Sequence, residues 1–363
     1  MKIKSLKLKN FRNYPFLEFS LEDGPTIFYG DNAQGKTNIL EAAYISGTTK
    51  SHRGTKDRDV IKFGEEEAHI ESVIEKNGLD YKIDIHLKKN SPKGIAINKF
   101  PIKKASELFG IVHYVFFSPE DLNIIKNGPS ERRRFLDMEL SQLDKIYLNH
   151  LSNYNRIINQ RNHLLKEIYG KESKDKKDML DVWDMQLVRH GTAIIERRKK
   201  FVEEINSIIS SIHYNLTGGK ESIYISYEPG NGSLPLEKAL LKNRERDIRL
   251  KSTSVGPHRD DLCFMMEKID IRKFGSQGQQ RTSALSLKLA EIEIVKKEIG
   301  DTPILLLDDV LSELDSHRQQ YLLDSIHGIQ TLITCTGVEE FIKHQFKVNK
   351  IFYVKEGSIS RVN

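Results

Sequence analysis

Apolar residues recur every three or four positions through the middle of the chain. One run covers residues 136–168 and a second covers residues 180–212, with a charged segment, residues 171–178, between them. This spacing places apolar side chains on one face of a helix. The pattern predicts two long antiparallel helices joined by a solvated turn, which together form a helical lobe.

Shorter apolar runs lie nearer the two ends of the chain. Residues 26–29 and 303–307 are continuous apolar stretches typical of buried parallel strands, and residues 331–335 predict another strand. Residues 68–76 and 80–88 alternate polar and apolar side chains, which predicts an antiparallel hairpin. We therefore expect a mixed α/β core to which both ends of the chain contribute.

A glycine-rich loop follows the first of these strands. Residues 30–37 match the phosphate-binding pattern G-x-x-x-x-G-K-[ST], and residues 38–46 predict the helix that such a loop needs. Lys36 would reach the β- and γ-phosphates of ATP, and the Thr37 hydroxyl would coordinate Mg²⁺. The residues expected to bind the nucleotide here are Gly30, Asp31, Asn32, Ala33, Gln34, Gly35, Lys36 and Thr37.

The second half of the expected site follows the strand at residues 303–307. Two carboxylates, Asp308 and Asp309, come directly after this strand. Asp308 would hold Mg²⁺ together with Thr37, and Asp309 stands where a water-activating carboxylate belongs. We expect Lys36, Asp308 and Asp309 to be the catalytic residues.

Three further motifs distinguish an ABC-type ATPase from a small kinase or a GTPase. Residues 276–281 resemble the ABC signature, in which Ser276 and Gly278 would contact the γ-phosphate held by an opposite subunit. Residues 312–315 resemble the D-loop that crosses the dimer interface. Residues 116–122 occupy the place of the Q-loop. This order of motifs predicts an ABC-type protein.

The spacing of these motifs predicts the domain organisation. Glu120 and Ser276 are only 156 positions apart (276 − 120), too few for the extended coiled coils of SMC proteins. We expect an SMC-like head without a long coiled coil. Its ATPase core would comprise residues 1–118 and 286–363, and residues 119–285 would form the inserted α-helical lobe that carries the signature motif.

The charge of the chain is compatible with a polyanionic partner. Lys and Arg number 57 against 51 Asp and Glu, which gives a net charge of +6. Phosphate contact and a merely solvated surface are both open interpretations for each basic cluster. The clusters are residues 132–134, residues 197–200, and Lys242, Arg244, Arg246, Arg249 and Lys251.

The remaining composition indicates a cytoplasmic protein. The first residues contain no signal-peptide pattern, and no apolar run reaches the length of a membrane-spanning helix. We therefore expect no membrane partner. Cys263 and Cys335 have no metal-ligand spacing and are expected to be buried reduced thiols.

Seven segments distributed from the first strand to the D-loop resemble the RecF family of bacterial recombination mediators. They are residues 6–14, 30–37, 51–53, 117–122, 131–137, 254–261 and 307–315. The resemblance implies a protein that dimerises when ATP is bound, engages DNA at boundaries between single and double strands, and hydrolyses ATP slowly. It also implies RecR and RecO as partners, assistance to RecA loading, and a part in the SOS response.

The same resemblance assigns roles to individual residues. Arg12 and Asn13 would lie against the nucleotide base, and Arg53 would lie near the phosphates or the DNA. A surface cation or a turn residue is the alternative at each position. For residues 256–261, Gly-Pro-His-Arg-Asp-Asp, we favour a structural or interface role, including a rigid turn whose charges pair with one another.

Two departures from the general ABC pattern indicate slow chemistry. Asp309 replaces the usual glutamate, and the switch histidine is absent, with Thr334 or Thr336 in its place. Threonine can orient a phosphate or a water but cannot take up a proton near neutral pH. We expect a weak ATPase that DNA stimulates and whose output is DNA binding.

Two other functions compete with this interpretation. A nuclease-ATPase or an SMC motor would need a metal-nuclease cluster or long coiled coils, and the sequence shows neither. A nucleotide kinase would share the phosphate loop. The signature serine, the D-loop and the position of the acidic pair argue against the kinase.

Overall fold

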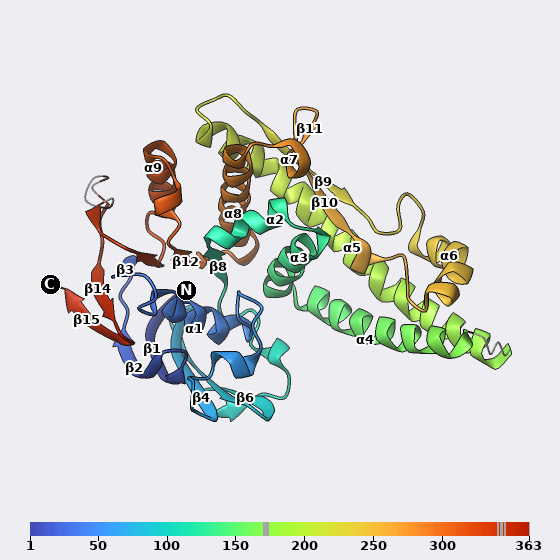
Figure 1. Ribbon diagram of the computed structural model, residues 1–363, viewed down its shortest axis with the longest axis horizontal. Coiled ribbons are helices and arrows are strands. Elements are labelled where there is room, and N and C mark those ends of the chain that lie inside the picture. Colours follow the sequence, from blue (N-terminus) through green and yellow to red (C-terminus); the bar gives the residue numbers. More distant parts are fainter. Residues whose placement is uncertain (170–173, 340, 342–343, 345, 363) are drawn as a thin grey trace. The chain divides into compact units, whose positions relative to one another are not determined.

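The computed structural model describes residues 1–169, 174–339, 341, 344 and 346–362 (Figure 1). The chain divides into two compact units. Unit 1 comprises Met1–Asp121 and Leu287–Asn363, and unit 2 comprises Leu122–Ser286.

One sheet of unit 1 carries the glycine-rich loop. Its strand order is β15-β14-β3-β13-β12-β8, in which all pairs are parallel except β14 with β15. The parallel strands are mostly buried, as their apolar runs predicted. The strands are β3 (Pro25–Tyr29), β8 (Tyr114–Phe117), β12 (Ile304–Asp308), β13 (Thr331–Cys335), β14 (Lys350–Lys355) and β15 (Ser358–Val362).

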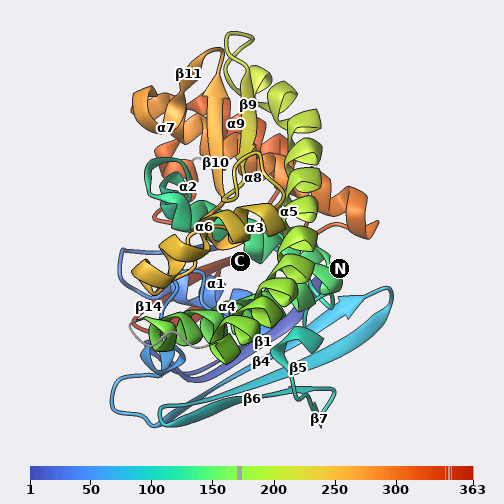
Figure 2. The ribbon, with the colours of Figure 1, turned by 90° about the vertical axis from the view of Figure 1, so that its right-hand side faces the viewer.

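A second sheet of unit 1 is antiparallel throughout, in the order β2-β1-β4-β5-β6-β7 (Figure 2). The predicted hairpin at residues 68–76 and 80–88 is confirmed as β4 and β5, with alternate residues buried. The strands are β1 (Lys2–Phe11), β2 (Tyr14–Ser20), β4 (Glu67–Lys76), β5 (Leu79–Lys88), β6 (Ser91–Ile97) and β7 (Phe100–Pro101).

The helices of unit 1 extend from the carboxyl ends of its parallel strands. The predicted helix after the glycine-rich loop is confirmed as α1 (Lys36–Thr48), and α9 (Ser316–Ser325) follows the acidic pair. The boundary between the units falls within α8 (Gln277–Ile299). Short 3-10 helices cover Asp57–Val60, Ala105–Glu107, Pro119–Asp121 and Leu311–Glu313.

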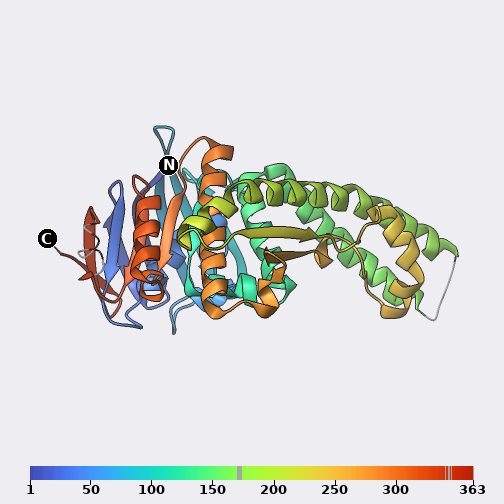
Figure 3. The ribbon, with the colours of Figure 1, turned by 90° about the horizontal axis from the view of Figure 1, so that it is seen from above.

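Unit 2 is mainly helical, and α4 and α5 run side by side (Figure 3). A three-stranded antiparallel sheet, β11-β10-β9, accompanies the helices. The helices are α2 (Leu122–Lys126), α3 (Pro129–Leu143), α4 (Lys145–Ile168), α5 (Lys174–Leu216), α6 (Leu236–Leu250) and α7 (Ile271–Phe274), and the strands are β9 (Ile223–Glu228), β10 (Asp261–Met266) and β11 (Ile269–Asp270). Across the described residues, no helix is long and apolar enough to cross a membrane.

The prediction of two long helices joined by a charged turn was wrong in two details. The run that begins at residue 136 is divided between α3 and α4, because the Asp144 carboxylate accepts hydrogen bonds from the N–H groups of Ile146 and Tyr147 and so caps a new helix. The expected charged turn also ends earlier, since α5 already begins at Lys174. Lysine is a good helix former, so charge alone does not indicate a loop. The rest of that turn, residues 171–173, lies outside the described residues.

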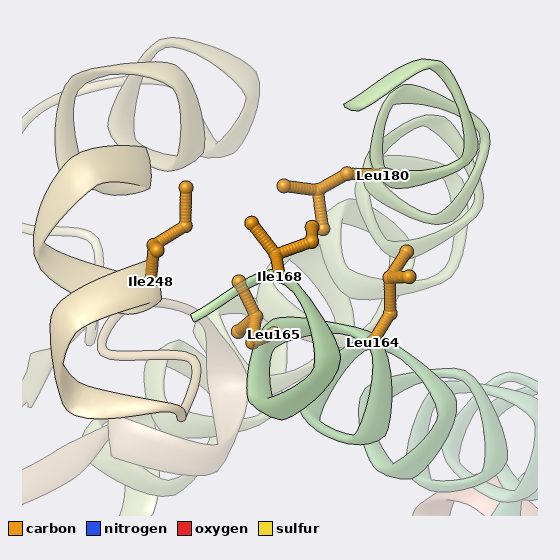
Figure 4. Packing of buried hydrophobic residues seen from close by; sticks show 5 residues of the cluster. All are labelled: Leu164, Leu165, Ile168, Leu180 and Ile248. Atoms are coloured by element: carbon orange, nitrogen blue, oxygen red, sulfur yellow. The ribbon is translucent and has the colours of Figure 1, made fainter. Parts of the chain in front are cut away.

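A buried apolar cluster joins three helices of unit 2. Leu164, Leu165 and Ile168 of α4 pack against Leu180 of α5 and Ile248 of α6 (Figure 4). Trp183 packs against the same cluster. Burial of a leucine or isoleucine side chain contributes about 1.5–3 kcal/mol, so this contact fixes α6 on the α4–α5 pair.

Candidate nucleotide-binding site

The glycine-rich loop connects β3 to α1 in a conformation that its glycines permit. Gly30 and Gly35 have φ values of 146° and 109°. A Cβ at Gly30 would collide with the Val354 carbonyl oxygen, and one at Gly35 would collide with the Asn13 amide. Among the residues that the structure describes, no side chain caps the N-terminus of α1. The first-turn N–H groups of this helix therefore suit a phosphate.

Lys36 lies over this loop. Its ammonium donates to the carbonyl oxygens of Gly30 at 2.5 Å and Asp31 at 2.8 Å. Burial lowers the pKa of Lys36, and the charges of Asp309 and Asp308 oppose this shift. A buried ammonium whose hydrogen bonds within the described part of the chain go to carbonyl oxygens gains from an anion beside it, which fits the phosphate role that the sequence predicted.

The two expected Mg²⁺ ligands lie together at the carboxyl end of β12. The Thr37 hydroxyl donates to Asp308 Oδ1 at 2.7 Å, and the Thr334 hydroxyl donates to the same oxygen at 2.7 Å. Burial raises the pKa of Asp308, while these hydrogen bonds and the charge of Arg53 act in the opposite direction. A hydroxyl and a carboxylate are the hard oxygen ligands that Mg²⁺ prefers, so the residues present fit this ion.

Asp309 follows β12 and precedes residues 312–315, which the sequence analysis interpreted as the D-loop. Its φ is 52°, and its N–H donates to the Thr334 carbonyl and hydroxyl oxygens, each at 3.1 Å. The Ser312 hydroxyl donates to the Asp309 carbonyl at 2.8 Å. Of the two threonines expected at the switch position, Thr334 contacts both aspartates, and Thr336 is exposed directly after β13.

Arg12 and Asn13 lie beside the loop. Asn13 donates to the Gln34 carbonyl at 2.9 Å and accepts from the Asn38 amide at 2.9 Å, so it connects the loop to α1. Arg12 forms a bidentate pair with Glu41 at 2.7 and 2.8 Å. The sequence analysis missed Glu41, although a single carboxylate within an apolar helix was a usable signal.

The expected signature residues lie at the N-terminus of α8 in unit 2. The Ser276 hydroxyl accepts from the Gln279 N–H at 3.2 Å, and the Ser276 N–H donates to the Gln279 side chain at 3.0 Å. This reciprocal pair is a capping box. Ser276 and Gly278 are both exposed. Ser276 therefore begins the helix and is accessible to a second molecule.

Two arginines of the basic clusters are unavailable to DNA. Arg132 and Arg198 are only 3% and 1% exposed. Arg198 pairs with Asp260 at 2.7 Å and with Asp137 at 2.6 Å, and Arg132 pairs with Asp261 at 2.5 Å. Both arginines face the interior of unit 2, so counting them as surface charge was wrong. The exposed members of the clusters include Lys199, Lys200, Lys242, Arg246, Arg249 and Lys251.

The Gly-Pro-His-Arg-Asp-Asp segment anchors this interior network. Its two aspartates pair with arginines of α3, α5 and α7, so the expectation that its charges pair with each other was wrong. His258 bonds to the Tyr154 hydroxyl at 2.8 Å and to the Thr253 carbonyl at 3.0 Å. Burial lowers the pKa of His258 to about 4, so this histidine is neutral at physiological pH. Both cysteines are buried thiols, as predicted.

The chain is similar to known proteins over nearly all of its length. The sequence model of the family described as RecF/RecN/SMC N terminal domain matches residues 2–360. The chain is 60% identical to the DNA replication and repair protein RecF of Agathobacter rectalis and 59% identical to that of Lachnospira eligens, and each match covers 100% of both chains.

Solved structures agree with the sequence relatives. A structure of the recombination mediator protein RecF with ATP, from the RecFOR pathway, is 35% identical, has a TM-score of 0.92, and matches 99% of this chain and 97% of that chain. An SMC head domain from Pyrococcus furiosus has a TM-score of 0.58 at 17% identity, with 99% of this chain and 95% of that chain covered, and it shows the fold alone. The predicted fold class, an α/β ABC-type ATPase core with an inserted helical lobe, is confirmed.

Proposed function

The chain belongs to the RecF family, and from this premise we propose that it is an ATP-gated DNA-binding protein of recombinational repair and replication. One observation carries the proposal: Thr37 and Asp308, 271 positions apart, meet in a hydrogen bond of 2.7 Å beside Lys36. A hydroxyl, a buried carboxylate and a buried ammonium at an uncapped helix N-terminus form a site for a nucleoside triphosphate with its metal ion. The ATP complex of a 35% identical relative supports the same conclusion.

Each residue of the site has a distinct proposed role. Lys36 and the N–H groups at the start of α1 bind the phosphates, and Thr37 and Asp308 hold Mg²⁺, which supplies charge compensation when bound. Asp309 orients the attacking water, and Thr336 supplies a hydroxyl where other ABC proteins have histidine. No described side chain at the switch position titrates near neutral pH, so we expect slow hydrolysis.

ATP would act by closing a homodimer. Ser276 and Gly278 are exposed at the start of α8, where a helix N-terminus can read the γ-phosphate held by a second copy. The closed dimer binds DNA at boundaries between single and double strands, and hydrolysis releases it. In the cell we propose a cytoplasmic protein that acts with RecR and RecO, assists RecA loading and contributes to the SOS response.

Light scattering with ATP, with ADP and without nucleotide tests the dimer directly. Wild type should dimerise only with ATP. Ser276→Arg should remain monomeric, because the added side chain blocks the N-terminus of α8, where the γ-phosphate of the second copy would bind. Ser152→Arg, at an exposed position on α4, is the matched control and should dimerise normally. If ATP binds but no dimer forms, or if Ser276→Arg dimerises, the signature interpretation fails and the kinase becomes the better hypothesis.

Steady-state hydrolysis tests the proposed timing. We expect turnover well below the about 10 s⁻¹ that is typical of enzymes, with an increase when gapped DNA is added. A turnover as fast as that of a transporter or a helicase, or one that DNA does not change, would contradict the proposal that slow hydrolysis sets the time of release from DNA.

A further inference from the structure

A fully buried carboxylate lies within the helix that follows the phosphate-binding loop. Glu41 is 0% exposed, and its carboxylate accepts hydrogen bonds from Arg12 Nε at 2.8 Å, from Arg12 Nη2 at 2.7 Å and from the Ser51 hydroxyl at 2.5 Å. A buried charge persists only where partners compensate its lost hydration. Glu41 has such partners from two separate segments of unit 1.

Most N–H groups of the first partner, Arg12, form hydrogen bonds within unit 1. Besides Glu41, its guanidinium donates to the Thr55 hydroxyl at 3.2 Å and to the Asp59 carbonyl at 2.8 Å. These contacts use four of the five N–H groups of an arginine. The backbone of Arg12 is also in the left-handed region, with φ 54°. The plane of the guanidinium is therefore fixed by its partners.

The second partner connects Glu41 to another arginine. The Ser51 hydroxyl, which donates to Glu41, accepts a hydrogen bond from the Arg53 N–H at 3.1 Å. The positive charge of Arg53 acts to lower the pKa of both Glu41 and Asp308. Ser51 thus connects the backbone of residues 51–53, here called the Arg53 segment, to α1 by hydrogen bonds. The same helix carries Lys36 and Thr37.

We propose that Glu41 is a positioning residue of the nucleotide site, which fixes both Arg12 and the Arg53 segment against the phosphate-binding helix. The carboxylate of Glu41 is a counter-charge to both Arg12 and Arg53, and it lies on the helix that begins with Lys36. The inference rests on the proposed ATP-binding function.

Glu41 carries its charge throughout the working pH range. Burial alone would raise its pKa, but the hydrogen bonds from Arg12 and Ser51 and the charges of Arg12 and Arg53 together lower the pKa below its ordinary value. Glutamine at this position keeps the size of the side chain but removes the charge and one acceptor. Glu41→Gln therefore isolates the ionic part of the contact.

A double-mutant cycle on the affinity for ATP tests the proposal. Glu41→Gln should weaken binding about tenfold to a hundredfold, the range for a lost hydrogen bond to a charged group. Arg12→Ala should weaken it comparably, and the double mutant should be no weaker than Arg12→Ala alone, because Glu41 acts through Arg12. Fully multiplied losses, or a Glu41→Gln variant that binds ATP like wild type, would overturn the inference.

A matched variant separates positioning from folding. Asp301 is a partly buried carboxylate paired with the N-terminal amine at 2.8 Å, before the amino end of β12 and so at the opposite sheet edge from Asp308. Asp301→Asn should lower thermal stability in the absence of nucleotide but leave ATP affinity unchanged. If Asp301→Asn and Glu41→Gln lower ATP affinity equally, Glu41 has only a general structural role.

Ser51→Ala provides a second test that keeps Glu41 intact. It removes the link to the Arg53 segment but retains the Arg12 pair, so we expect a lower kcat with KM changed less than twofold. A raised KM with an unchanged kcat would contradict this division of roles. The titration of wild type with ATP tests the proposed function separately. If wild type does not bind ATP, the proposed function itself is wrong.

Discussion

At position 309 the backbone adopts φ 52°, which aspartate and asparagine tolerate better than other residues with a Cβ because their short polar side chains form local hydrogen bonds. The two hydrogen bonds between its N–H and Thr334 hold this conformation. The left-handed backbone at this position therefore favours aspartate over the usual glutamate. It follows that lengthening Asp309 to glutamate would strain the loop.

Asp308 gives a prediction about stability at the same scale. Burial raises its pKa, so the folded protein binds that proton more tightly than the unfolded chain does. Without nucleotide, stability should therefore fall as pH rises from the ordinary carboxyl range through the folded-state pKa. Asp308→Asn should raise the free energy of unfolding by about 0.5–2 kcal/mol above that pKa, and the gain should shrink below it. Urea unfolding across pH measures this, and a loss of stability at pH 8 would contradict it.

At the scale of elements, the network around Arg198 ties α5 to α3 and to the Gly-Pro-His-Arg-Asp-Asp segment. Arg198 also donates to the Pro257 carbonyl at 2.7 Å and to the Tyr147 hydroxyl at 3.0 Å. Arg198→Ala leaves Asp260, which is 0% exposed, without its cation. Breaking a buried pair in this way costs about 3–5 kcal/mol. Lys199→Ala, one position away and exposed, should cost less than about 0.5 kcal/mol. Equal unfolding midpoints for the two variants would show that the network contributes little.

The sequence predicted elements wherever local periodicity decides the structure. The strands β3, β12 and β13, the β4–β5 hairpin and the α4–α5 pair all followed from apolar spacing. The sequence also held a signal at Arg198 that the sequence analysis overlooked. Arg198 lies four residues after Ile194 and three before Phe201, so the apolar spacing already places it on the buried face of α5, whereas Lys199 lies about 100° away. The partners of Glu41 and the cap made by Asp144 are a different case, because apolar spacing does not identify which polar groups meet in the fold.

At the scale of the whole molecule, charge connects the proposed dimer to the proposed binding of DNA. Each chain carries +6, so a dimer carries +12 (2 × 6), and the exposed lysines and arginines listed above contribute to that charge although Arg132 and Arg198 do not contact solvent freely. Contacts with phosphates release counterions, so affinity for DNA should fall steeply with salt. ATP would then control DNA binding by doubling the charge in one complex.

This coupling predicts that blocked hydrolysis traps the protein on DNA. Asp309→Asn removes the carboxylate to which we assign the orientation of water but keeps a side chain suited to the left-handed backbone, so the fold and the proposed ATP-driven dimerisation should persist. With ATP, its complex with labelled gapped DNA should dissociate at least about tenfold more slowly than that of wild type after addition of unlabelled competitor, because loss of a catalytic general base lowers rates by about 10²–10⁴-fold. Wild type with a non-hydrolysable ATP analogue is the matched control and should show the same long lifetime. If Asp309→Asn releases DNA at the wild-type rate while hydrolysing no ATP, release does not depend on hydrolysis and the timer role is wrong.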